Sequence, residues 1–301
     1  FGIQPEEHLA ATGGAPLDDP IGTGPFVLDE WNRGDSIIFS RNDSYWGAVP
    51  AYQTLVFRWA TEGAARLLEL QTGTVDQITN VSPDDFETVK ADANLQFIPV
   101  ANPNIMYLAM TNTFPPFDNL KVREAIGMGI DRQRIVDNFY PEGSEVASHF
   151  TPCSIPNGCE GDEWYAFDAA AAQALLAEGL AEAGFSLDTW RPGLFYRNVF
   201  RGYLPEPAAV AVEIQTQLLE NLGVTAVVTE MESGAFIDES TNGRLDGFYM
   251  LGWGADYPHI TNFLDFHFGE ANPQFGTAHP EIYNVLVGAS TIADEAVTAP
   301  M

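Results

Sequence analysis

The order of apolar and polar residues along the chain predicts strands that alternate with helices. Runs rich in β-branched and aromatic residues, or alternating in polarity, predict strands at residues 36–41, 54–59, 75–78, 105–110, 224–229 and 247–253. A loop with several Gly and Pro residues at 20–31 leads into a further strand. Short strands of this kind need partners in a sheet and helices to cover its faces.

Apolar residues spaced three or four positions apart predict helices at residues 62–72, 120–130, 168–183 and 207–222. The first, third and fourth helices each end at a glycine, which is the usual stop signal for a helix. Ser82-Pro83 predicts a capped helix start, and Asp131 predicts the cap of another helix. Helices that alternate with strands predict the α/β fold class.

Residues 246–258 hold the most informative pattern of the chain. An apolar strand breaks at glycines, and Trp253, Asp256 and Tyr257 follow at its end. Ligands of α/β proteins usually bind at strand ends. We expect Asp256 to be a buried carboxylate, and without a metal-ligand cluster beside it such a group suits a cationic partner, for example an amino group. The alternative for Trp253 and Tyr257 is that both pack in the protein core and contact no ligand.

The charge of the chain excludes one class of function and disfavours another. There are 42 acidic residues against 13 basic ones, a net charge of −29. Phosphate would be repelled over almost the whole surface, so the sequence excludes nucleic-acid binding and disfavours contact with an anionic membrane. No apolar run approaches the roughly 20 residues that cross a bilayer.

Two cysteines, Cys153 and Cys159, have five residues between them, which include a Pro and an Asn-Gly turn. The spacing and the turn predict a small disulfide loop, which is typical of an oxidising compartment outside the cytoplasm. The alternative is two unlinked thiols. No second Cys/His pair lies at the sequence spacing of zinc ligands, so we predict no metal site.

The search for catalytic motifs finds little. There is no Gly-x-Ser-x-Gly elbow, and Gly22-Thr-Gly24 lacks the Gly-Lys-Ser/Thr of a phosphate loop. The histidines are scattered; a metal site at His259 and His267 is the weak alternative. Asp256 lacks a nucleophile or oxyanion motif nearby, so we predict no enzyme and no cofactor.

A cation beside aromatic residues favours binding instead. Arg201 lies in Arg-Gly-Tyr-Leu-Pro, just before the helix at 207. An arginine can hold a carboxylate with two parallel hydrogen bonds. The other interpretation is a surface charge or a salt bridge to one of the many acids.

Several motifs, in order over roughly residues 20–285, resemble family 5 of the solute-binding proteins, which serve ABC importers for dipeptides, oligopeptides and nickel. The matching segments are Gly22-Thr-Gly-Pro-Phe26 with Trp31, Arg41-Asn42 with Tyr45-Trp46-Gly47, Leu70-Gln-Thr-Gly-Thr-Val-Asp76, Pro116-Phe117-Asp118, Val122-Arg123-Glu124-Ala125-Ile126, and Ile130-Asp131-Arg132. Each motif alone is loose, whereas the ordered set is specific.

The resemblance implies a periplasmic-binding-protein-like architecture of type II, cluster C, whose two lobes close on a solute. Residues 1–112 would belong to the first lobe and 113–301 to the second. We expect the chain to be incomplete at both ends, without its signal segment and without the tail that returns to the first lobe. The complete protein would be a periplasmic or extracellular monomer, free or lipid-anchored, that works with a membrane permease.

The resemblance also assigns roles to residues. Asp256 matches the aspartate that pairs with a peptide's amino terminus, and Arg201 resembles the arginine that dipeptide binders use for the carboxyl terminus. Tyr203, Trp253 and Tyr257 would line the cleft. Two alternatives remain: a secreted hydrolase that uses acidic residues, and a nickel or metallophore receptor of the same fold.

Overall fold

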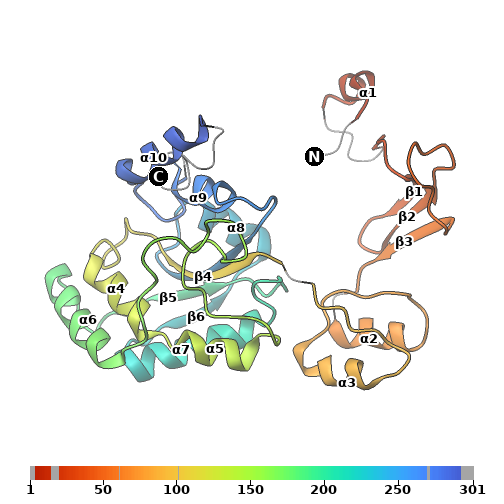
Figure 1. Cartoon of the computed structure of the whole chain (residues 1–301). Coiled ribbons are helices and arrows are strands. Elements are labelled where there is room, and N and C mark those ends of the chain that lie inside the picture. Colours follow the sequence, from red (N-terminus) through yellow and green to blue (C-terminus); the bar gives the residue numbers. More distant parts are fainter. Residues whose placement is uncertain (1–3, 15–19, 61, 101, 270–271, 293–301) are drawn as a thin grey trace. The chain divides into compact units, whose positions relative to one another are not determined.

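The computed structural model describes residues 4–14, 20–60, 62–100, 102–269 and 272–292 (Figure 1). The chain divides into two compact units, Phe1–Val81 and Ser82–Met301, which we describe separately. The predicted lobes, 1–112 and 113–301, concern the complete protein and stay a prediction. No helix among the described residues is both long and apolar enough to cross a membrane.

The first unit contains a three-stranded antiparallel sheet. Its elements are α1 (Glu6–Ala11), β1 (Phe26–Asn32), β2 (Ser36–Arg41), β3 (Thr54–Arg58) and α2 (Gly63–Gln71), with the strands in the order β1-β2-β3. Two of the motif segments meet here, because the Trp46 indole donates a hydrogen bond to the Thr23 carbonyl (3.0 Å) and the Asn42 amide donates one to the Gly24 carbonyl (3.3 Å). The motifs therefore fix the loop that enters β1.

The second unit contains a four-stranded mixed sheet. Its elements are η1 (Pro83–Asp85), α3 (Phe86–Ala91), β4 (Asn104–Met110), α4 (Leu120–Gly129), α5 (Arg132–Phe139), α6 (Ala169–Ala183), β5 (Gly193–Tyr196), α7 (Pro207–Leu222), β6 (Val227–Glu230), α8 (Ser233–Thr241), β7 (Gly247–Gly254), α9 (Thr261–Phe268) and α10 (Pro280–Ser290). The strand order is β4-β7-β5-β6, in which β5 runs parallel to both β6 and β7, and β4 is antiparallel to β7. The carboxyl ends of β5, β6 and β7 therefore share one edge, which we call the carboxyl edge.

Strand β7 lies at the centre of the core. Phe248 and Met250 face the helices α4, α6 and α7, while Tyr249 and Leu251 face Phe236 of α8. Figure 1 shows these two sets of helices on opposite faces of the sheet. A strand covered on both faces has apolar residues at nearly every position, which is why the sequence 247–253 is an unbroken apolar run.

The predicted start of α5 and the predicted ends of α6 and α7 are confirmed. Asp131 and Asp168 cap α5 and α6, since each side chain accepts a hydrogen bond from a backbone N–H in the first turn. Helices α6 and α7 end at Gly184 and Gly223, which have φ of +77° and +70°. Only glycine adopts such angles readily, so the stop signals work as predicted.

Some sequence predictions are wrong. Residues 75–78 form no strand, because none of these four residues is buried and the segment pairs with no strand in the described chain. The Ser82 hydroxyl does not cap the helix start; a 3-10 turn at Pro83–Asp85 precedes α3 instead. The strand expected at 224–229 is β6, shifted to Val227–Glu230, because Val224 and Ala226 are buried in the core before the strand begins.

The predicted disulfide is confirmed. Cys153 and Cys159 are bonded, with 5.0 Å between their Cα atoms. Asn157, in the turn between them, has φ of +63°, a left-handed angle that asparagine tolerates better than most residues. The bond closes a small loop on the surface of the second unit.

Candidate ligand-binding site

Asn262 organises the end of β7. Its side-chain oxygen accepts hydrogen bonds from the Trp253 indole (3.0 Å) and the Asp256 backbone N–H (3.1 Å), and its amide donates to the Asp256 carboxylate (3.2 Å). Asn262 is 6% exposed and lies in the first turn of α9. One buried amide thus sets the position of Trp253 and of Asp256, two of the residues that the sequence singled out.

The prediction that Asp256 is buried is wrong. Strand β7 ends at Gly254, and Asp256 lies two residues beyond it in an exposed turn. Because the sheet has already ended, the carboxylate is held by Asn262 but is open to solvent in this structure. Trp253 is half-buried, with its ring stacked on Phe266 at 4.3 Å between ring centroids.

Tyr257 follows Asp256 and is 47% exposed. Its hydroxyl lies 3.4 Å from the Thr261 hydroxyl, which also contacts the His259 ring at 2.9 Å. The aromatic ring is therefore available at the surface next to the Asp256 carboxylate and is not a core residue.

Arg201 lies in a tight turn between β5 and α7. Its backbone exchanges two hydrogen bonds with Leu204, of 3.1 and 2.9 Å. The guanidinium is half-buried and donates to the Phe200 carbonyl at 2.9 Å. In the part of the chain that the structure describes, no carboxylate lies within 4.0 Å of it. The salt bridge that was the alternative interpretation is therefore absent from the described residues.

Tyr203 packs this turn against the sheet. A Cβ placed on Gly252 of β7 would lie 2.4 Å from the Tyr203 ring, so the ring can pack here only because residue 252 is glycine. A Cβ on Gly202 would lie 3.3 Å from the Asn104 amide, and Asn104 pairs with Gly254 at the end of β7. The turn that carries Arg201 therefore lies beside the end of β7.

The five predicted ligand residues thus occupy one end of the sheet. Arg201 and Tyr203 come from the turn after β5, while Trp253, Asp256 and Tyr257 come from the end of β7. Among the described residues, no hydrogen bond or ion pair joins Arg201 to Asp256. Opposite charges that stand at one edge without pairing to each other can hold the two ends of a zwitterion.

A family comparison decides the class of the protein. Residues 2–275 match the model of the bacterial extracellular solute-binding proteins, family 5 Middle. The chain belongs to this family. Since the match spans most of the chain, the resemblance of the ordered motifs is confirmed.

Relatives of this family 5 chain include the dipeptide-binding protein of Escherichia coli (strain K12), 28% identical over 82% of this chain and 45% of that protein. Heme-binding protein A of Haemophilus influenzae is also 28% identical, over 84% of this chain and 45% of that protein. The chain thus spans about half the length of these curated relatives. A solved dipeptide-binding protein from Pseudoalteromonas sp. SM9913, in complex with Met-Leu, superposes with a TM-score of 0.86 and 26% identity over 99% of this chain and 59% of that one. The predicted α/β fold of periplasmic binding proteins is confirmed.

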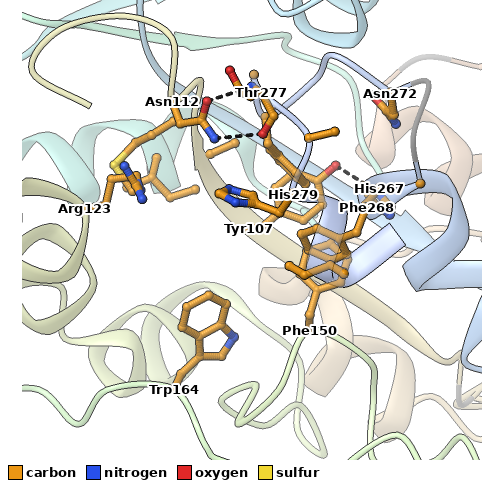
Figure 2. A pocket seen from close by; sticks show the side chains of 18 residues that line it. Tyr107, Asn112, Arg123, Phe150, Trp164, His267, Phe268, Asn272, Thr277 and His279 are labelled. Atoms are coloured by element: carbon orange, nitrogen blue, oxygen red, sulfur yellow. Dashed lines mark hydrogen bonds between the residues drawn. The ribbon is translucent and has the colours of Figure 1, made fainter. Parts of the chain in front are cut away.

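A separate cavity of about 350 Å³ lies along β4 in this family 5 chain (Figure 2). Several aromatic side chains line it, with Tyr107, Phe150 and His267 among them, and none of the five predicted ligand residues contributes. His267 is 2% exposed, its Nδ1 lies 2.6 Å from the Phe263 carbonyl, and burial lowers its pKa to about 4. A neutral histidine fixed in this way belongs to the core of the second unit.

The described residues bring one set of metal-binding residue types together, His149 with Cys153 and Cys159. The two sulfurs are bonded to each other, so they are not available as thiolate ligands. His259 is not part of this set and contacts Thr261 instead. The metal-binding alternative therefore gains no support from the described residues.

Sequence reasoning missed Asn262 and Arg197. Asn262 stands in the Thr-Asn pair that begins α9, and a polar residue in the first turn of a helix is too common to mark a ligand site. Arg197, at the end of β5, donates hydrogen bonds to the hydroxyls of Ser233 (3.1 Å) and Tyr203 (3.4 Å). Only the strand order places these residues at the carboxyl edge.

Proposed function

We propose that this chain is the central part of an extracytoplasmic solute-binding protein of an ABC importer, and that the complete protein captures short peptides. In this proposal Asp256 pairs with the peptide ammonium group, and Arg201 pairs with the peptide carboxylate. Tyr203, Trp253 and Tyr257 line the cleft around the peptide. The protein acts by binding alone, without catalysis.

The observation that carries the proposal is the pair of opposite charges at the carboxyl edge. Asp256 is positioned by Asn262 and Arg201 by its turn, and among the described residues neither has an ion-pair partner within 4.0 Å. A free peptide presents an ammonium group and a carboxylate, so it complements both groups. Dipeptide-binding relatives support the same ligand class.

Calorimetric titration of the full-length protein tests the proposal. Met-Leu is the probe, and its N-acetylated and C-amidated forms are the matched controls, because each lacks one terminal charge. We expect Met-Leu to bind, and each blocked form to bind at least about tenfold more weakly, which is the loss of one charge-assisted hydrogen-bonded pair. Equal affinity for free and blocked peptides would rule out the two-charge clamp.

We also propose where the protein works. Membership of the family supports a complete protein outside the cytoplasm, free or lipid-anchored, and a monomer that delivers its solute to a membrane permease. The net charge of −29 supports a protein that does not bind nucleic acid. Sedimentation of the full-length protein with and without peptide tests the monomer: we expect one species of monomeric mass, and a dimer would contradict it.

A further inference from the structure

A second arginine of the carboxyl edge has no acidic partner. Arg197 follows directly after β5, is half-buried, and donates hydrogen bonds to the hydroxyls of Ser233 and Tyr203. In the described part of the chain no carboxylate lies within 4.0 Å of its guanidinium. A guanidinium has five N–H donors, so most of them lack an acceptor among these residues.

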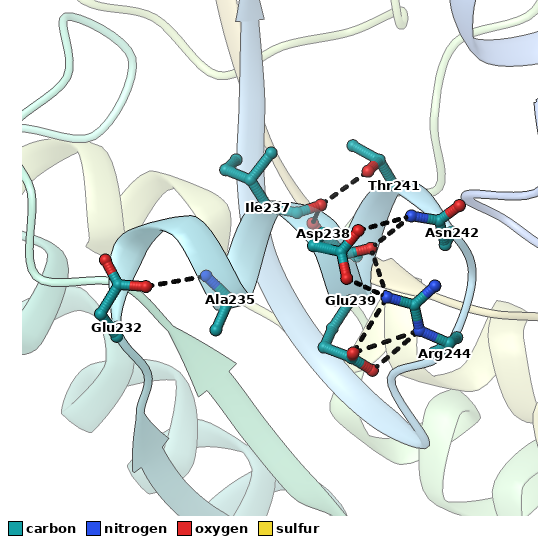
Figure 3. Close-up of polar contacts among 9 residues, drawn as sticks. Glu232, Ala235, Ile237, Asp238, Glu239, Thr241, Asn242 and Arg244 are labelled. Carbon is teal, nitrogen blue, oxygen red and sulfur yellow. Dashed lines mark hydrogen bonds and ion pairs between the residues drawn. The ribbon is translucent and has the colours of Figure 1, made fainter.

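This arrangement differs from that of the arginines that form ion pairs in this chain, which has 42 acidic residues. Arg244 shows such a pair in Figure 3, where the carboxylates of Asp238 and Glu239 both contact its guanidinium. Arg134 likewise pairs with two glutamates, at 2.8 and 3.2 Å.

Arg123, Arg132 and Arg191 have no carboxylate partner among the described residues either, but their guanidinium groups donate to backbone carbonyls. Arg197 donates to two side-chain hydroxyls instead, and together with Arg201, four positions away, it leaves a place for an anion.

Two acids lie on and just after β6, the strand that pairs with β5 beside Arg197, and both have other partners. The Glu230 carboxylate accepts a hydrogen bond from the Tyr196 hydroxyl at 3.0 Å. The Glu232 carboxylate accepts from the Ala235 backbone N–H at 2.9 Å, at the start of α8 (Figure 3). Hydrogen bonds from the backbone N–H groups of Gly234 and Ala235 hold the pKa of Glu232 below its usual value. Neither acid neutralises the Arg197 guanidinium.

The two hydroxyls that accept from Arg197 add donors of their own. A hydroxyl whose oxygen accepts a hydrogen bond still carries a hydrogen that can be donated. Ser233 and Tyr203 therefore offer two O–H donors beside the guanidinium. Tyr203 is two residues from Arg201 and its ring packs on Gly252, so this group of donors adjoins the proposed carboxylate site.

We infer that Arg197, Ser233 and Tyr203 form a second anion subsite beside Arg201, and that it binds the side-chain carboxylate of a peptide whose last residue is Asp or Glu. Such a residue carries two carboxylates at one end of the peptide, one for each arginine. The inference rests on the proposed function, since it adds a side-chain preference to the same peptide site.

Titration of the full-length protein with Ala-Glu and Ala-Gln tests the subsite, because the two peptides have nearly the same shape and differ by one charge. We expect the wild type to bind Ala-Glu at least about tenfold more tightly. The Arg197→Gln variant should lose this preference and keep its affinity for Ala-Gln. Equal affinities of the wild type for the two peptides would overturn the subsite without any variant.

Arg191→Gln is the matched control. Arg191 is exposed and donates to the carbonyls of Leu187 and Trp190. Its replacement by Gln changes the net charge by the same amount as Arg197→Gln. The Arg191→Gln variant should keep the preference for Ala-Glu. If it loses as much of this preference as Arg197→Gln does, the effect comes from the electrostatic field of the whole protein and the subsite is wrong. Failure of both peptides to bind would overturn the proposed function itself, and the subsite with it.

Discussion

Replacing Asn262 by alanine should both destabilise the protein and weaken peptide binding. The side chain makes three hydrogen bonds, with the Trp253 indole, the Asp256 backbone N–H and the Asp256 carboxylate, over 3.0 to 3.2 Å. A net contribution of roughly 0.5–1.5 kcal/mol for each bond gives about 1.5–4.5 kcal/mol of stability for the set. Water can reach the exposed Asp256 after the change, so we expect a loss in the lower part of this range, about 2 kcal/mol.

Chemical denaturation of the full-length protein measures the free energy of unfolding, and calorimetry measures the affinity for Met-Leu. We expect Asn262→Ala to lower the free energy of unfolding as calculated and the affinity at least several-fold, because the Asp256 carboxylate loses its fixed position. Asn242→Ala is the control, since Asn242 is exposed and bonds only to Asp238. A variant at Asn262 that unfolds and binds like the wild type would refute the reasoning.

Two further changes test the packing and the burial described above. Gly252→Ala places a Cβ 2.4 Å from the Tyr203 ring and equally close to a backbone carbonyl of β4, so it should cost roughly 1–3 kcal/mol in a denaturation experiment and weaken peptide binding; wild-type values for both would contradict the close approach. For His267, the folded-state pKa of about 4 lies below the ordinary 6.5, so the unfolded state binds the proton more readily. Its stability contribution is complete above about pH 6.5 and is lost as the pH falls towards 4. Denaturation experiments at several pH values give the free energy of unfolding as a function of pH. Over this range it should fall less steeply for His267→Gln than for the wild type, and equal slopes would contradict the assignment.

Strong local patterns predicted most of the second unit's helices and its central strand. The apolar run at 247–253, and the helices that end at Gly184 and Gly223, depend on neighbours in sequence. Helix α8 was missed because its sequence, Ser-Gly-Ala-Phe-Ile-Asp-Glu-Ser-Thr, buries only Phe236 and Ser240 and is poor in strong helix formers. Strand β5 was missed because four residues are too few for a periodic pattern.

The candidate site was predicted only in part, for a similar reason. Arg201 and Asp256 stand in recognisable segments, whereas the exposure of Asp256 depends on where β7 stops. The role of Asn262 depends on a side chain that folds back across six residues to Asp256. The proposed role of Arg197 depends on its hydroxyl partners and on the absence of a carboxylate within reach among the described residues. Both depend on three-dimensional packing, which a single sequence does not reveal.

The most direct test of the central claim is the affinity of the full-length Asp256→Asn protein for Met-Leu. The change keeps the shape of the side chain and its contact with Asn262 but removes the negative charge that we assign to the peptide ammonium group. We expect the affinity to fall at least about tenfold, since a hydrogen-bonded charge pair contributes roughly 1.5–3 kcal/mol. The affinity for N-acetyl-Met-Leu should stay unchanged. If Asp256→Asn binds Met-Leu as tightly as the wild type, the proposed peptide clamp is wrong.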